Sequence, residues 1–267
     1  MAYSEVREGT TLSVGRPLRR FARGHLTYTY EVIDVWIADS LLASTSGTGS
    51  ASGLPLFNPY SDTGRHIDSR IMPSFLYNTV DSPITSHSGM RVTSSLQFAG
   101  SALRGSYNYM KPELEMIAYV PTGRRTGFGF RGQSGLLATF GDTKSVPYYL
   151  RYYLGGETQI RGTDIRTVGP FDSSNRALGG NKFLLFNAEY YLDLFGPVRL
   201  LAFHDAGQAF DESHPFSLRD LRTSSGGELR VFLPVLNVPF RLIYYINVYR
   251  DTFQPYRGFK FAVGTTF

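Results

Sequence analysis

Apolar and polar side chains alternate with a period of two residues along almost the whole chain, and the 3.6-residue period of a helix is almost absent. The alternation is clear in residues 107–120, 183–194 and 240–248. In the last of these segments the apolar positions are Phe240, Leu242, Tyr244, Ile246 and Val248. Because successive side chains of a strand point to opposite faces, the pattern predicts an all-β chain.

The lengths of the predicted strands favour a membrane protein. The alternation predicts eleven strands, at residues 7–16, 25–37, 66–79, 90–99, 105–120, 127–140, 181–194, 198–210, 222–234, 239–250 and 259–267. Many have ten or more residues, above the ~5–6 usual in globular proteins and close to the ~9–11 of a tilted membrane-spanning strand. Long loops at 38–65 and 141–180 lie on one side, and mostly tight turns lie on the other. We therefore expect residues 1–267 to form a single antiparallel transmembrane β-barrel domain with about 11–12 strands.

Composition excludes several other classes. No run approaches the ~18–20 apolar residues of a membrane helix, although spanning strands escape such a search because half their residues face a polar lumen. The net charge is +5, but the basic residues are scattered, and Arg16–Arg23 is the densest run. We expect no nucleic-acid partner. The amino-terminal residues have no apolar core of the kind found in a signal peptide.

The carboxyl-terminal strand fixes the orientation of the chain. Phe259, Phe261, Val263, Thr265 and Phe267 share one face, which suits a strand whose outer side meets lipid. If this end lies on the short-turn, periplasmic side, eleven strands place the amino terminus on the long-loop side. Single-chain barrels normally have an even number of strands and a periplasmic start. The sequence therefore predicts the carboxyl-terminal portion of a longer protein with a larger barrel.

Charged residues in one loop and two strands form a candidate site. The 141–180 loop contains Gln159-Ile-Arg-Gly-Thr-Asp164, and Glu189 and Asp205 follow on the polar faces of consecutive predicted strands. Alternation alone points both carboxylates into the lumen. A guanidinium has five donors in a rigid fork, which suits carboxylate recognition. The other charged positions on these faces are expected to form a solvated lumen wall; they are Arg91, Lys111, Glu113, Glu115, Glu228 and Arg230.

On these motifs the chain resembles the carboxyl-terminal barrel of the BamA-like superfamily of outer-membrane protein assembly factors and surface antigens. The resemblance implies a sixteen-stranded family barrel and a loop motif, Ile160-Arg161-Gly162, that folds back into the lumen. It also implies wall partners for Arg161 at Glu189 and in Asp205-Ala-Gly207, and a closing strand carrying Phe259, Phe261, Val263 and Phe267. Thr163 stands where the family motif has an aromatic residue.

The resemblance implies an integral protein of a Gram-negative outer membrane that inserts or translocates other outer-membrane proteins through a lateral seam between its first and last strands. Its expected partners are the lipid bilayer, unfolded outer-membrane clients and assembly lipoproteins. We expect no enzyme activity, cofactor or metal, because the five histidines lack metal-ligand spacing and no nucleophile motif is present. Two alternatives stay open: a truncated or engineered barrel, or passive pore, without insertase activity, and a soluble barrel that binds a small ligand.

Overall fold

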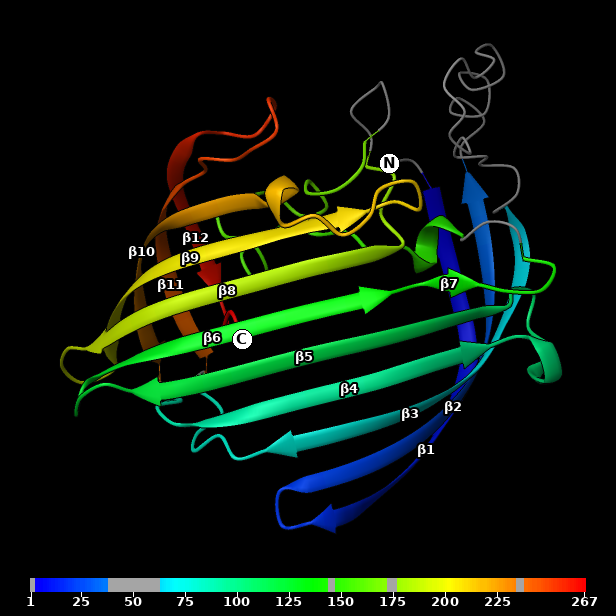
Figure 1. The fold of residues 1–267 in the computed structure, drawn as a ribbon, viewed down its shortest axis with the longest axis horizontal. Helices are drawn as coiled ribbons and strands as arrows, with labels where there is room; N and C mark the ends of the chain where they lie inside the picture. The colour runs from blue at the N-terminus through cyan, green and yellow to red at the C-terminus, as the bar shows by residue number, and fades with distance from the viewer. Residues whose placement is uncertain (1–2, 38–62, 144–146, 172–176, 234–237) are drawn as a thin grey trace.

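The computed structural model describes residues 3–37, 63–143, 147–171, 177–233 and 238–267. Its strands form one antiparallel sheet of twelve strands, in which the long strands follow one another in chain order (Figure 1). The strands are β1 (Tyr3–Arg19), β2 (Ala22–Ile37), β3 (Gly64–Asn78), β4 (Gly89–Ala99), β5 (Tyr109–Pro121), β6 (Thr126–Leu136), β7 (Ala138–Thr139), β8 (Lys182–Asp193), β9 (Val198–Phe210), β10 (Arg222–Leu233), β11 (Val238–Ile246) and β12 (Arg257–Val263). The two-residue strand β7 lies off this path and pairs with β5. The all-β antiparallel fold predicted from the sequence is confirmed.

In the part of the chain that the structure describes, helical structure is limited to the short 3-10 turns η2 (Ser101–Leu103), η3 (Tyr148–Leu150) and η4 (Leu218–Asp220). Among the described residues, no helix has the length and apolar character needed to cross a bilayer. Residues 38–62, which make up most of the predicted 38–65 loop, lie outside the described part of the chain.

The two faces of the sheet differ as the period-two pattern predicts. On β8, Phe186 and Tyr190 are exposed on the outer face, whereas Asn187, Glu189 and Tyr191 are buried on the inner face. The same alternation continues on β9 and β11. The outer face therefore presents apolar side chains to the surroundings, and the inner face collects the buried polar groups.

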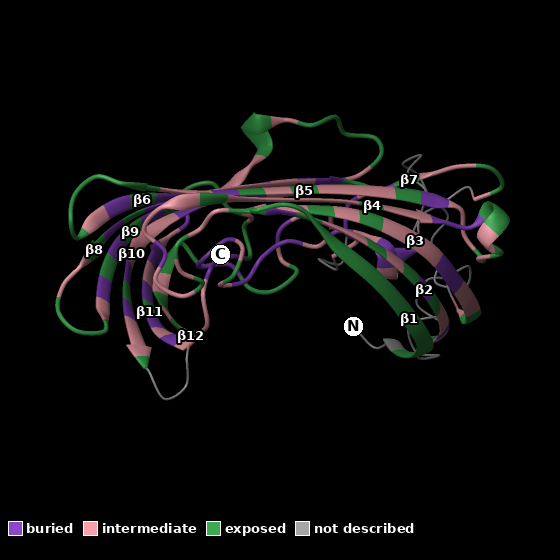
Figure 2. Ribbon diagram, turned by 90° about the horizontal axis from the view of Figure 1, so that it is seen from below, coloured by how far each residue is buried: buried purple, intermediate pink, exposed green. Residues whose placement is uncertain are grey.

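The sheet is curved into an arch with two unpaired edges. Within the described residues, β1 pairs only with β2, and β12 pairs only with β11. Figure 2 shows β1 and β12 in opposite arms of the arch, with the carboxyl terminus between the arms. The two edges also differ in length, since β1 has 17 residues and β12 has 7.

The last residues depart from the predicted closing strand of 259–267. Phe259, Phe261 and Val263 are exposed on the outer face, as expected, but β12 ends at Val263. Gly264 then adopts a φ of 104°, a left-handed conformation that glycine tolerates without strain. The chain turns into the lumen, where the ring of Phe267 stacks on Tyr119 with the centroids 6.1 Å apart. The placement of Phe267 on the lipid-facing side was therefore wrong.

Buried side chains concentrate inside the arch beneath the loop that follows β7. Leu150, Leu154 and Ile160 of this loop pack with Phe183 and Leu185 of β8 in one apolar cluster. The interior of the arch is therefore packed on this side, and the loop forms part of its core.

Candidate functional site

A tight turn places the Ile160-Arg161-Gly162 motif against the inner wall. The backbone N–H of Ile160 donates to the carbonyl of Gly156 at 3.0 Å, and the Thr163 hydroxyl donates to the carbonyl of Ile160 at 2.7 Å. The same hydroxyl accepts a bond from the backbone N–H of Gly156. Thr163 thus closes the turn by hydrogen bonding.

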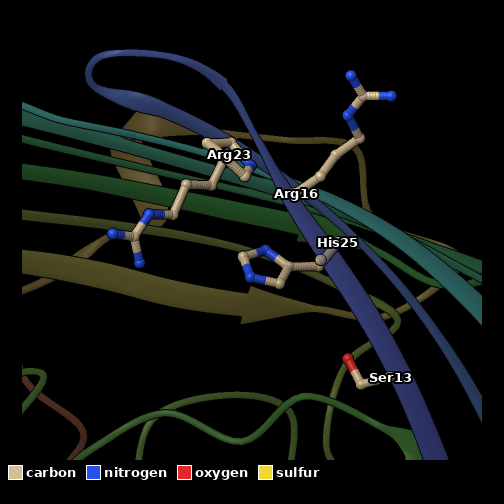
Figure 3. Close-up of a pocket in the computed structure, with 6 residues that line it drawn as sticks. Ser13, Arg16, Arg23 and His25 are labelled. Atoms are coloured by element: carbon tan, nitrogen blue, oxygen red, sulfur yellow. The ribbon is translucent and has the colours of Figure 1, made fainter.

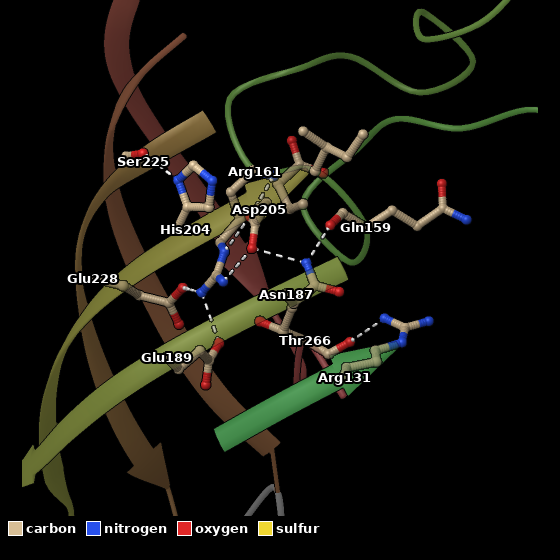
Figure 4. Close-up of polar contacts among 12 residues, drawn as sticks. Arg131, Gln159, Arg161, Asn187, Glu189, His204, Asp205, Ser225, Glu228 and Thr266 are labelled. Atoms are coloured by element: carbon tan, nitrogen blue, oxygen red, sulfur yellow. Dashed lines mark hydrogen bonds and ion pairs between the residues drawn. The ribbon is translucent and has the colours of Figure 1, made fainter. Parts of the chain in front are cut away.

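Arg161 contacts both of the acidic residues named from the sequence (Figure 4). Its Nε and Nη2 donate to the two carboxylate oxygens of Asp205 at 2.7 and 2.6 Å, and its backbone N–H donates to Asp205 at 2.9 Å. Its Nη1 lies 2.7 Å from Glu189 Oε1. The guanidinium also lies over the Phe203 ring, 3.8 Å from the centroid. The bidentate bond to Asp205 fixes the position and the rotation of the arginine side chain.

The network extends beyond the residues named from the sequence. Arg161 Nη1 also donates to Glu228 on β10 at 3.1 Å, and Glu228 accepts further bonds from Arg230 at 2.6 Å and from Arg241 of β11 at 2.7 Å. Arg230 reaches Glu189 as well, at 2.9 Å. Glu228 and Arg230 were expected in a solvated wall, and that expectation was wrong, because their exposed fractions are 1% and 5%. The loop covers this part of the wall and excludes water from it.

The charges of this network balance. Arg161, Arg230 and Arg241 face three carboxylates, those of Glu189, Asp205 and Glu228. We call these six residues the loop–wall ion network. Burial of Arg161 opposes its charged form, but attraction by Asp205 and then by Glu189 outweighs burial and raises the pKa of Arg161 above its ordinary value.

Two glycines allow the loop to approach the wall closely. A Cβ atom at Gly207 would lie 3.0 Å from Ile160 Cδ1, so the absence of a side chain at 207 leaves room for the buried isoleucine. Gly162 has a φ of 87°, and a side chain there would collide with the ring of Tyr245. The contribution of Gly207 is therefore steric, because it adds no polar partner to Arg161.

The chain matches the Omp85 superfamily domain over residues 1–267. It belongs to the Omp85 superfamily. It is 29% identical over 209 residues to the outer membrane protein assembly factor BamA of Nitratidesulfovibrio vulgaris, and 24% identical over 209 residues to BamA of Neisseria meningitidis. These alignments cover 76% and 66% of this chain but 26% of each relative, so the chain spans about a quarter of the length of these proteins.

Two solved structures share the fold of this chain. BamA from Haemophilus ducreyi lacking POTRA domains 1–3 superimposes with a TM-score of 0.77 at 16% identity, covering 98% of this chain and 55% of that one. CdiB from Acinetobacter baumannii gives a TM-score of 0.61 at 11% identity, covering 97% and 42% of the two chains. As an Omp85 superfamily member with this β-barrel fold, the chain is an outer-membrane protein.

Outside the loop–wall ion network, the described residues hold few side-chain groups suited to other chemistry. In that part of the chain no group of three or more histidine, aspartate or glutamate side chains is arranged to hold a metal ion. His204, on the outer face of β9, instead forms a 2.7 Å hydrogen bond with Ser225. The Omp85 relatives above carry the names of assembly factors rather than of enzymes.

Lys260 joins the 141–180 loop to the last strand, β12. From the inner face of β12, its Nζ donates to the Thr163 carbonyl at 2.8 Å and to Asp164 Oδ1 at 2.7 Å, and it lies 3.1 Å from Glu157 Oε1. Sequence patterns gave no reason to single out this lysine, because its partners come from a loop about a hundred residues earlier in the chain. The contacts tie the loop to one of the two unpaired edges of the sheet.

Replacing Lys260 with Met should loosen this connection while keeping the length of the side chain. We expect a loss of about 1–2 kcal/mol in the free energy of unfolding in detergent, because the Thr163 carbonyl and the Asp164 and Glu157 carboxylates lose a partly buried charged donor. Limited proteolysis should also cut faster near the exposed Ile165. The matched control is Lys182→Met, since among the described residues the Lys182 ammonium has only a long contact, with the Phe216 ring at 6.0 Å. Equal behaviour of the two variants would contradict the role given to Lys260.

Proposed function

We propose that this chain is the barrel part of an outer-membrane assembly factor that inserts or translocates other outer-membrane proteins through a lateral seam between β1 and β12. The observation that carries the proposal is the pair of unpaired strand edges at the two ends of the sheet, within the described residues. Unpaired backbone donors and acceptors are costly in lipid, so an open edge favours the addition of an incoming strand. Unfolded outer-membrane proteins are the proposed clients, and assembly lipoproteins are the proposed accessory partners.

The unequal lengths of the two edges support β1 as the template. If β12 paired along its full seven residues, more than half of the 17-residue edge of β1 would still lack a partner. The tail after Val263 turns inward and holds Thr266 against Arg131 and Arg230, which keeps the end of β12 short. A client strand could therefore pair with β1 before β12 does.

The loop–wall ion network has a proposed supporting role. The Ile160-Arg161-Gly162 motif would hold the loop inside the arch, with Glu189 and Asp205 as its wall partners. Lys260 would couple the position of the loop to the position of β12. In this proposal the loop keeps the seam strand in place until a client arrives.

The decisive experiment measures assisted folding. The purified chain is placed in liposomes, a urea-unfolded β-barrel client is added, and the folded client is followed by its altered migration on a semi-native gel. We expect faster client folding than in empty liposomes. If the liposomes conduct ions but client folding is not accelerated, the insertase proposal is wrong, and the passive-pore alternative is the better description.

Two proline variants of β1 supply a matched pair for the same assay. Successive backbone N–H groups of a strand point to opposite sides, so one of Thr10 and Thr11 donates toward β2 and the other donates toward the open edge. Proline has no N–H group. One of the variants Thr10→Pro and Thr11→Pro therefore removes a hydrogen bond to β2, and the other removes a donor from the open edge. The variant with the smaller loss of stability identifies the open-edge position. We expect this variant to lose assisted folding nonetheless, and full activity in it would contradict templating by β1.

A further inference from the structure

The tip of the β1–β2 hairpin is strongly basic. Arg16, Arg19, Arg20 and Arg23 fall within eight residues, and no acidic residue occurs between Glu8 and Glu31. All four arginines are exposed. Among the described residues, no carboxylate forms an ion pair with any of them, so the tip carries an uncompensated positive charge. The loop–wall ion network does not use these residues, and the proposed seam chemistry does not require them.

The hairpin tip lies at the end of the sheet that carries the short turns, which is the end we expect to face the periplasm. Because strands alternate in direction, the turn after β1 is at the same end of the sheet as the short turns β5–β6 and β8–β9 and the carboxyl end of β12. Apolar side chains are exposed beside the arginines, namely Val14, Leu18 and Phe21. The guanidinium of Arg20 lies 5.1 Å from the centre of the Phe21 ring. Apolar and aromatic side chains next to arginines are typical of the boundary between lipid tails and headgroups.

The arginines are distributed over both faces of the hairpin. Figure 3 shows Arg23 and His25 projecting on one side of the ribbon and Arg16 on the other. On the inner side, the register places Gly15 opposite His25 and Pro17 opposite Arg23. A concavity of about 390 Å³ lies here, lined by Ser13, Gly15, Arg16, Pro17, Arg23 and His25. It offers guanidinium, imidazole and hydroxyl groups to one small anionic group.

We propose that the tip of the β1–β2 hairpin binds the phosphate headgroups of anionic phospholipids in the periplasmic leaflet. A guanidinium group can donate two parallel hydrogen bonds to two oxygens of a phosphate group. Clustered basic residues at a membrane surface are also attracted to anionic lipids. Leu18 and Phe21 would lie among the acyl chains beneath the bound headgroups. The apolar neighbours favour a lipid over an acidic protein, which would need no such side chains. Binding would anchor the hairpin whose outer edge is unpaired.

The test measures lipid retention by the folded chain in uncharged detergent. Phosphatidylglycerol or phosphatidylcholine is titrated into the micelles, and bound lipids are counted by native mass spectrometry. We expect the wild-type chain to retain phosphatidylglycerol preferentially. Arg19→Gln/Arg20→Gln should weaken this binding about 30-fold, which corresponds to about 2 kcal/mol at about 1 kcal/mol per arginine. Arg16→Gln/Arg23→Gln, which removes the Arg23 guanidinium from the concavity and the Arg16 guanidinium from the opposite face of the hairpin, should weaken it similarly.

The matched control is Arg104→Gln/Arg219→Gln, which removes two exposed arginines from the opposite, long-loop side. It should bind phosphatidylglycerol as the wild type does. Semi-native gel migration shows that each variant is folded before lipids are compared. No preference for phosphatidylglycerol in the wild type, or equal losses in control and tip variants, would overturn the proposal. Full displacement of the lipid by inorganic phosphate would show a simple phosphate site and would overturn the lipid assignment.

Discussion

Arg161→Ala is expected to lower the free energy of unfolding of the barrel in detergent by about 3–5 kcal/mol. The substitution leaves Asp205 with one remaining side-chain donor, Asn187, and removes one of two arginines from Glu189. Both carboxylates are almost fully buried, so the lost partner is not replaced by water. Denaturant unfolding can be followed with the single tryptophan, Trp36, which is remote in sequence from the loop and lies on β2. The 141–180 loop should also become a faster protease substrate.

A double-mutant cycle distinguishes the ion pair from general damage. Asp205→Ala should cost about as much as Arg161→Ala, and the double variant should cost clearly less than the sum, because the two residues contact each other directly. Arg161→Lys is the conservative comparison. It keeps the charge but loses the bidentate geometry, so it should recover only part of the stability. Additive losses in the cycle would mean that the Arg161–Asp205 contact does not exist in solution.

The fold could be predicted from the sequence because alternate residues of each strand face lipid, which favours apolar side chains, and the lumen, which favours polar ones. Period-two alternation identified the long strands and their order, since each strand repeats the same simple contrast. Strand ends were less accurate. The segment 127–140 breaks after Leu136, and the last strand ends at Val263. At Gly264 the alternation continues in the sequence while the backbone turns, because the tail gains contacts with Tyr119 and Arg131 that no local pattern encodes.

Only about half of the candidate site could be predicted from the sequence, because local patterns do not encode contacts between distant segments. Glu189 and Asp205 were found because a loop motif and two adjacent strands pointed to the same place. Glu228 and Arg241 lie on the inner faces of the next two strands, and alternation does place them there. What alternation does not show is which part of the inner wall the loop covers. A covered carboxylate and a more exposed one have the same sequence pattern, and the side chains of Glu228 and Glu113, 0% and 31% exposed, differ only in the folded structure.

Glu228→Gln is therefore expected to be as damaging as the loss of Arg161, at about 3–5 kcal/mol. Glu228 is the shared acceptor of Arg161, Arg230 and Arg241. Replacing its carboxylate with a neutral amide therefore leaves the buried loop–wall ion network with one excess positive charge. The measurement is the same denaturant unfolding in detergent. Glu113→Gln is the matched control, because Glu113 is more exposed and its carboxylate lies 3.7 Å from Lys111. The control should cost less than about 1 kcal/mol.

Charge balance predicts a rescue of this variant. Adding Arg241→Met to Glu228→Gln removes the excess charge, keeps an apolar stem of similar length, and leaves Arg161 and Arg230 facing Asp205 and Glu189. Arg241 would otherwise face only neutral acceptors among the described residues, namely the Glu157 carbonyl at 3.2 Å and the amide oxygen introduced at position 228. The double variant should regain most of the lost stability, although Arg241→Met alone destabilises the chain by leaving Glu228 with fewer donors. If the double variant is instead less stable than either single variant, the network acts through separate local contacts, and its overall charge does not determine stability.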